Sequence, residues 1–159
     1  MTNAQQLASF LSRYDPEVSE VAEATVAVLR RRYPHALELV YDNYNALVIG
    51  FGPTLRASDA IFSIALYPKW VSMFFLQATS LTDPAQLLQG SGTVARHIRL
   101  ASASMLDEPA VLDLMEQAVA KAAVPFDPAA SHQLIIKSVS AKQRERKPKS
   151  AAKAVRKAS

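Results

Sequence analysis

The fold is decided by a stretch that reads Ala57-Ser-Asp-Ala-Ile-Phe-Ser-Ile-Ala-Leu-Tyr67, then Pro68-Lys69, then Trp70-Val-Ser-Met-Phe-Phe-Leu-Gln77. Its two halves contain apolar runs of strand length that meet at a proline-marked turn, which is typical of a β-hairpin. A third run, residues 94–100, alternates between two faces, as strand side chains do. The sequence therefore predicts an antiparallel sheet centred on residues 57–100.

Working outward, two alternating segments at residues 37–41 and 47–51 bring the predicted sheet to five strands. Apolar residues at helical spacing predict helices over residues 4–14, 16–33 and 109–122, the last two of which begin at prolines. Residues 133–139 form either a short extra strand or a packed extension. The predicted fold class is α+β, with a five-stranded antiparallel meander packed on one face by N- and C-terminal helices.

The composition is that of one ordinary domain, since 50% of the 159 residues are hydrophobic and 20% are charged. We expect a short helix over residues 1–14, a single domain over 15–140 and a basic disordered tail over 141–159. The chain has no cysteine, so disulfides and thiolate metal sites are excluded. No apolar run approaches the roughly 18 residues that span a bilayer, and we expect a cytoplasmic protein without a membrane partner.

The basic charge is concentrated at the end of the chain. Residues 141–159 hold eight bases and one acid, a net charge of +7, whereas the rest of the chain holds ten bases and thirteen acids, a net charge of −3. Such a tail would attach weakly and without sequence preference to nucleic acid, and its alternative role is a solubilising extension. The eight bases are Lys142, Arg144, Arg146, Lys147, Lys149, Lys153, Arg156 and Lys157.

One combination of motifs resembles a known family. Leu87-Leu-Gln-Gly90-Ser-Gly92 runs into Arg96-His-Ile-Arg99, and Tyr33-Pro34 and Glu38-Leu-Val-Tyr41 precede them. Together these resemble the YdhG-like family of domains of unknown function over about residues 16–123. The resemblance implies a frataxin-like α+β domain. For some members it also implies an iron chaperone that delivers iron to an accepting protein from an acidic first helix and first strand.

Iron is accordingly the candidate metal. Carboxylate oxygens are suitable ligands, and an acidic ridge holds iron weakly without a cage. The alternative is a solvated helix face whose acids complement the helix dipole, which is the more common meaning of such charges. The available carboxylates are Glu17, Glu20, Glu23, Glu38 and Asp42.

An anion or small-molecule site is a further hypothesis. Glycines at positions 90 and 92 allow backbone N–H groups to form a nest for a phosphate or carboxylate. The alternative is a tight turn followed by exposed basic side chains on a half-solvated strand. The candidate residues are Gly90, Ser91, Gly92, Arg96, His97 and Arg99.

No motif in the sequence indicates catalysis. His35, His97 and His132 lie far apart in the sequence, and there is no Gly-x-Ser-x-Gly elbow. Trp70, Phe74 and Phe75 are expected in the core rather than on a stacking platform for bases, because they lie in a continuous apolar run. We therefore expect a non-enzymatic binding or carrier protein, with iron as the first ligand hypothesis. The alternatives are a nucleic-acid-associated protein tethered by its basic tail and a small-molecule or anion-binding domain.

Overall fold

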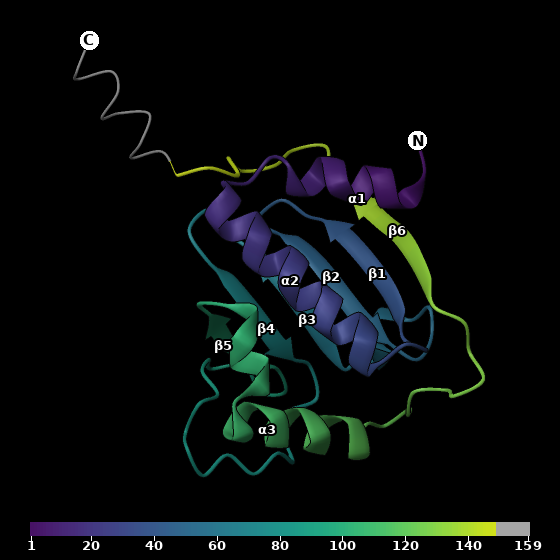
Figure 1. The fold of residues 1–159 in the computed structure, drawn as a ribbon, viewed down its shortest axis with the longest axis vertical. Helices are drawn as coiled ribbons and strands as arrows, with labels where there is room; N and C mark the ends of the chain where they lie inside the picture. Colours follow the sequence, from purple (N-terminus) through teal and green to yellow (C-terminus); the bar gives the residue numbers. More distant parts are fainter. Residues whose placement is uncertain (149–159) are drawn as a thin grey trace.

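A computed structural model describes residues 1–148, in which a six-stranded mixed sheet carries its helices on one face (Figure 1). The predicted α+β class is confirmed. Within this range no helix is both long enough and apolar enough to cross a lipid bilayer. The helices are α1 (Asn3–Leu11), α2 (Pro16–Arg32) and α3 (Pro109–Ala120), with short 3-10 turns η1 (Ala57–Asp59) and η2 (Ala103–Asp107). The strands are β1 (Leu37–Asp42), β2 (Leu47–Gly52), β3 (Phe62–Leu66), β4 (Val71–Phe75), β5 (Arg96–Leu100) and β6 (Gln133–Val139).

The sheet differs from the predicted one at its edge. Strands β1 to β5 form the expected antiparallel meander, in the order β5-β4-β3-β2-β1. The prediction of five antiparallel strands is wrong because β6 pairs with β1 in parallel, with a register shift between Val40 and Tyr41. Residues 121–132 carry the chain from α3 along the sheet edge, so that β6 arrives beside β1 in the same direction (Figure 1).

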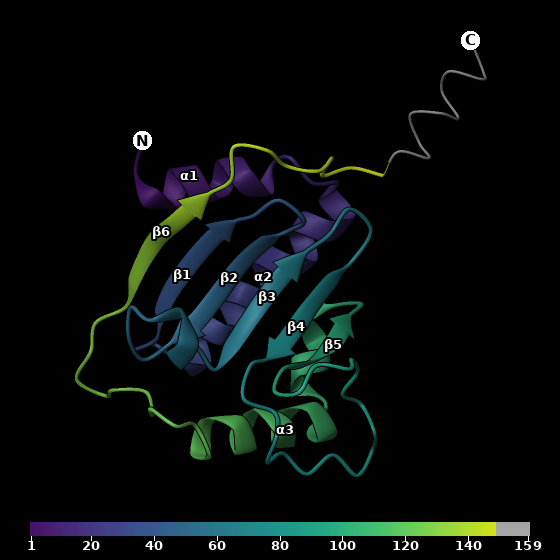
Figure 2. The same cartoon turned by 180° about the vertical axis from the view of Figure 1, so that it is seen from behind.

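The two faces of the sheet have different environments. Helix α2 lies in front of the strands in Figure 1 and behind them in Figure 2, and no helix of residues 1–148 covers the opposite face of β3 and β4. Alternate residues on these strands are fully buried on the helix side, where each large apolar side chain contributes about 1.5–3 kcal/mol. They are Phe62, Ile64 and Leu66 on β3, and Val71, Met73 and Phe75 on β4.

The buried side chain of Tyr14 connects the corner between α1 and α2 to the sheet. The Tyr14 hydroxyl donates to the Leu66 carbonyl and accepts from the Leu47 N–H, both at 3.0 Å. Burial raises the pKa of Tyr14 above its ordinary value of 10.0. The two hydrogen bonds hold the start of β2 and the end of β3 together at the end of the sheet where the candidate site lies.

The backbone at Gly52 lies close to that of Ala60, and this contact yields a first prediction. A Cβ atom at Gly52 would lie 2.9 Å from the Ala60 Cα, whereas one at Gly50 would find its nearest neighbour at 3.6 Å, an ordinary contact. We expect Gly52→Ala to lower the free energy of unfolding by about 1–3 kcal/mol, because backbone must shift. Gly50→Ala, the matched control, should change it by less. Urea unfolding of both variants measures the difference, and equal stabilities would refute this account of Gly52.

Candidate functional site: an aromatic and basic groove

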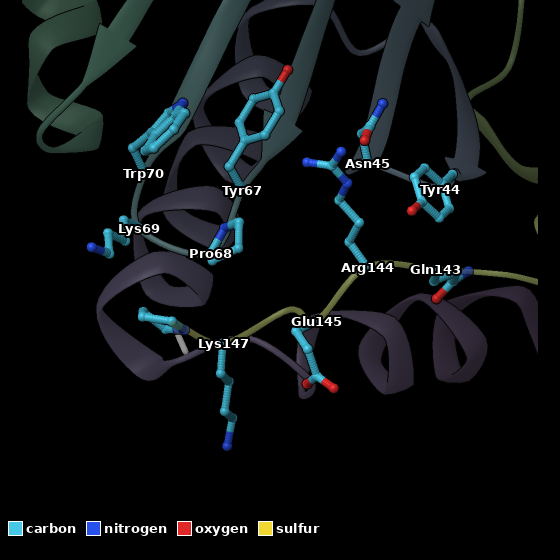
Figure 3. Close-up of a pocket in the computed structure, with 11 residues that line it drawn as sticks. Tyr44, Asn45, Tyr67, Pro68, Lys69, Trp70, Gln143, Arg144, Glu145 and Lys147 are labelled. Carbon is cyan, nitrogen blue, oxygen red and sulfur yellow. The ribbon is translucent and has the colours of Figure 1, made fainter. Parts of the chain in front are cut away.

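An open groove of about 1230 Å³ lies at the end of the sheet (Figure 3). One wall is the β1–β2 turn with Tyr44 and Asn45, and another is the β3–β4 turn, residues 67–70. The third wall is the C-terminal segment, residues 143–148 without Arg146. We call this feature the aromatic groove. It brings together three parts of the chain that are distant in sequence.

Two stacked rings line one side of the groove, and a cation lies beside them. The Tyr67 and Trp70 ring centroids are 5.2 Å apart with an interplanar angle of 28°. The Tyr67 N–H donates to the Trp70 carbonyl at 2.9 Å, which closes the β3–β4 turn and sets the two side chains beside each other. The Arg99 guanidinium lies 4.3 Å from the Trp70 ring centroid, a cation–π distance. Tyr67 and Arg99 thus both pack against the Trp70 ring.

Several basic side chains lie near the groove. Arg144 extends between the two turns, and Glu145 and Lys147 point away from the groove (Figure 3). The Arg144 guanidinium lies 5.4 Å from the Tyr44 ring centroid. Within residues 1–148, no carboxylate lies within ion-pair distance of Lys69, Arg99, Arg144 or Lys147. Residues 149–159 add four bases and no Asp or Glu. The groove therefore carries excess positive charge.

Arg146 anchors the C-terminal wall of the groove. Its side chain is 3% exposed, and its guanidinium donates to the Asp42 carboxylate at 2.9 Å and to the Asn43 carbonyl at 2.5 Å. It also lies 5.7 Å from the Tyr14 ring centroid. Next to it, the Arg144 N–H donates to the Tyr44 carbonyl at 2.9 Å. These contacts hold the segment against the β1–β2 turn.

The prediction that disorder begins at residue 141 is therefore wrong for residues 141–148. Arg146 neutralises a buried carboxylate that the sequence did not show to be buried, and this pairing orders the chain around it. Lys142, Arg144 and Lys147 are exposed, as expected. The other four predicted tail bases lie outside the described residues: Lys149, Lys153, Arg156 and Lys157.

The proposed iron ligands do not form a metal site. Glu38 is fully buried and accepts two hydrogen bonds from Arg30, at 2.7 and 2.9 Å, as well as contacting the His132 ring. The hydrogen bond to Glu38 raises the pKa of Arg30. Asp42 is 1% exposed and paired with Arg146, and its other oxygen lies 3.6 Å from Arg13. Both carboxylates are already neutralised.

The remaining acids of that set are on the surface of α2. Glu17, Glu20 and Glu23 are exposed, unlike the buried carboxylates of Glu38 and Asp42. Within the described residues no three His, Asp or Glu side chains gather in a way that could hold a metal ion. The residues present therefore do not fit the iron site that the family resemblance implies.

The predicted anion site is only partly assembled. Arg96 and His97 lie beside the glycine loop: a Cβ at Gly90 would be 3.3 Å from His97 Nδ1, and one at Gly92 would be 3.9 Å from an Arg96 guanidinium nitrogen. Gly90 has a φ of +112°, which explains the glycine without a ligand. Backbone hydrogen bonds between Gln89 and His97 close the loop against β5. Ser91 is exposed.

The sequence did not predict the residues of the groove. Phe75 is fully buried as expected, but Trp70 and Phe74 are half-buried on the helix-free face. The two-residue period of a strand could have indicated this position, because it places Trp70 and Phe74 on the opposite face from Val71, Met73 and Phe75. Arg99, predicted as part of an anion site with the glycine loop, instead covers Trp70.

The buried ion pair yields a second prediction. We expect Arg146→Ala to lower the free energy of unfolding by about 3–5 kcal/mol, because Asp42 would stay buried without its main partner. Arg144→Ala, which removes an exposed arginine two residues away, should change it by no more than about 0.5 kcal/mol. Urea unfolding compares the two.

A double-variant cycle separates the pair from other effects of the substitutions. Asp42→Ala combined with Arg146→Ala should be more stable than the sum of the single effects predicts, because the two groups are in direct contact. Strict additivity would contradict the anchoring role of this pair.

Comparison of the chain with models of known protein families, with curated proteins and with solved structures finds no match. The resemblance to the YdhG-like family and its frataxin-like fold stays a prediction from the sequence motifs.

Proposed function

We propose that this protein is a non-enzymatic nucleic-acid-binding protein and that the aromatic groove is its contact surface. One observation carries the proposal: the stacked Tyr67 and Trp70 rings lie beside Arg99, Lys69 and Arg144, cations that have no carboxylate partner within residues 1–148. Nucleic acids present the matching chemistry, since their phosphates are anionic and their bases are flat aromatic rings.

The charge distribution supports a phosphate-bearing ligand. Arg13, Arg30, Arg32 and Arg146 are paired with carboxylates, so they serve the fold. The cations at the groove are free to meet phosphates, and each phosphate contact releases condensed counterions, which is favourable at low salt. The four bases of residues 149–159 follow directly on this wall in the sequence and add to the attraction.

The acidic residues direct the ligand to the groove rather than to the helices. Glu17, Glu20 and Glu23 are exposed on α2, on the helix side of the molecule, where they repel phosphates. Rings and cations recognise base faces and phosphates, which all nucleotides share, and we expect little sequence preference. The iron-carrier hypothesis has no comparable support, because Glu38 and Asp42 are held by arginines.

The chain contains its own reporter for this proposal, since Trp70 is its only tryptophan. We expect oligothymidylate to quench the Trp70 fluorescence in a saturable way as it binds in the groove beside the Tyr67 and Trp70 pair. Lys69→Ala combined with Arg144→Ala should weaken binding about 10-fold at low salt. It should also reduce the slope of log affinity against log salt by about 0.7 per lost phosphate contact.

The matched control removes two exposed arginines elsewhere, Arg31 on α2 and Arg56 before η1. Arg31→Ala with Arg56→Ala lowers the net charge equally but leaves the groove intact, so its affinity should stay within about twofold of the unaltered chain. Equal losses in both double variants would show that only net charge matters. Absence of binding by the full chain at low salt would refute the proposed function.

A further inference from the structure

The helix-free face of the sheet continues from the aromatic groove along β4 and β5. Residues pointing to this face alternate with the buried ones, so Trp70, Ser72 and Phe74 follow one another along the chain on one side. Antiparallel pairing places Arg99 beside Ser72 and His97 beside Phe74. The views from the two sides show the helices on the other face only (Figures 1 and 2).

A second ring pair lies on this face beyond the first. The Phe74 and His97 ring centroids are 5.1 Å apart with an interplanar angle of 38°, and both side chains are half-buried. Four residues of strand separate Phe74 from Trp70, or about 13 Å at the usual rise per residue. Between the two ring pairs lie the small, buried side chains of Ser72 and Ala65, which are neighbours across β4 and β3. The two ring pairs are therefore separated by small, buried side chains of the sheet.

The charge of this face matches an anionic ligand. Strands β3, β4 and β5 contain no Asp or Glu, and β5 contributes the Arg99 guanidinium beside the first ring pair. An apolar protein partner would leave the Arg99 guanidinium facing it without an acceptor, whereas a phosphate backbone provides acceptors at every nucleotide.

We infer that the ligand is single-stranded, and that it runs from the aromatic groove past Arg99 to the Phe74 and His97 pair, with bases packed against the exposed edges of both ring pairs. This inference rests on the proposed function and extends it to a class of nucleic acid and a path. A duplex keeps its bases paired and stacked inside, so it cannot offer their faces to rings on a flat sheet. Phe74 thereby becomes a contact residue.

The test uses the full chain and fluorescence anisotropy of labelled oligonucleotides. The probes are an oligothymidylate of about fifteen nucleotides, within the range of site sizes for sheet-based binders, and a duplex of the same length. We expect the single strand to bind at least about 10-fold more tightly than the duplex. Phe74→Leu, which keeps an apolar side chain but removes the ring, should weaken single-strand binding about 10-fold.

Phe126→Leu is the matched control. Phe126 is also half-buried and stacked on another ring, at 5.3 Å from Tyr33, but it belongs to the helix-side core. Its variant should bind like the unaltered chain. Thermal melts of each variant verify folding. A photo-crosslink from an iodouracil oligonucleotide, mapped by mass spectrometry, locates the strand on the unaltered protein and should label both residues 67–70 and residues 74–77 or 94–100.

The outcomes separate the two proposals. If Trp70→Leu weakens binding while Phe74→Leu does not, and crosslinks stay within the groove, the path across the sheet is wrong and the groove remains the binding site. Equal affinity for the duplex overturns the single-strand assignment. If the unaltered chain binds neither probe, the proposed function itself fails.

Discussion

The ion pair between Arg146 and Asp42 is the contact on which the groove depends. Asp42 ends β1 with its carboxylate in the interior, and Arg146 reaches it from the far end of the described chain. Because a buried carboxylate without a partner is strongly unfavourable, the C-terminal segment has to lie against the β1–β2 turn. That position sets Arg144 over Tyr44 and completes the third wall. A constraint of the fold thus places Arg144 at the groove that we propose as the binding surface.

A second buried carboxylate has a similar role at the other end of β1. Glu38 binds Arg30 of α2 and contacts His132, which precedes β6. It ties the helix layer and the edge strand β6 to β1. Both acids of β1 are therefore occupied in joining distant segments, which removes them from the metal-handling role that the sequence suggested and leaves the unpaired cations as the chemically available groups.

The two faces of the sheet have different surroundings, and this difference bears on the proposed binding. Helix α2 covers one face, where Phe62, Ile64 and Met73 pack in the core, and the other face of the same strands keeps small side chains and half-buried rings. Rings on an uncovered face remain available to a ligand while their neighbours in the strand hold the sheet to the helix. A single apolar run such as residues 70–77 thus serves two purposes, because its alternate side chains face different environments.

The sequence by itself determined the α+β class, the antiparallel meander of β1 to β5 and the starts of α2 and α3, because local periodicity and proline positions govern these features. It could not determine that Glu38 and Asp42 would be buried and paired, since their partners lie 8 to 104 residues away. Nor could it bring Trp70 and Arg144 together in one groove, or place Arg99 over Trp70. Only tertiary packing brings such residues together, because charge pairing and ring stacking between distant segments leave no local pattern in the chain.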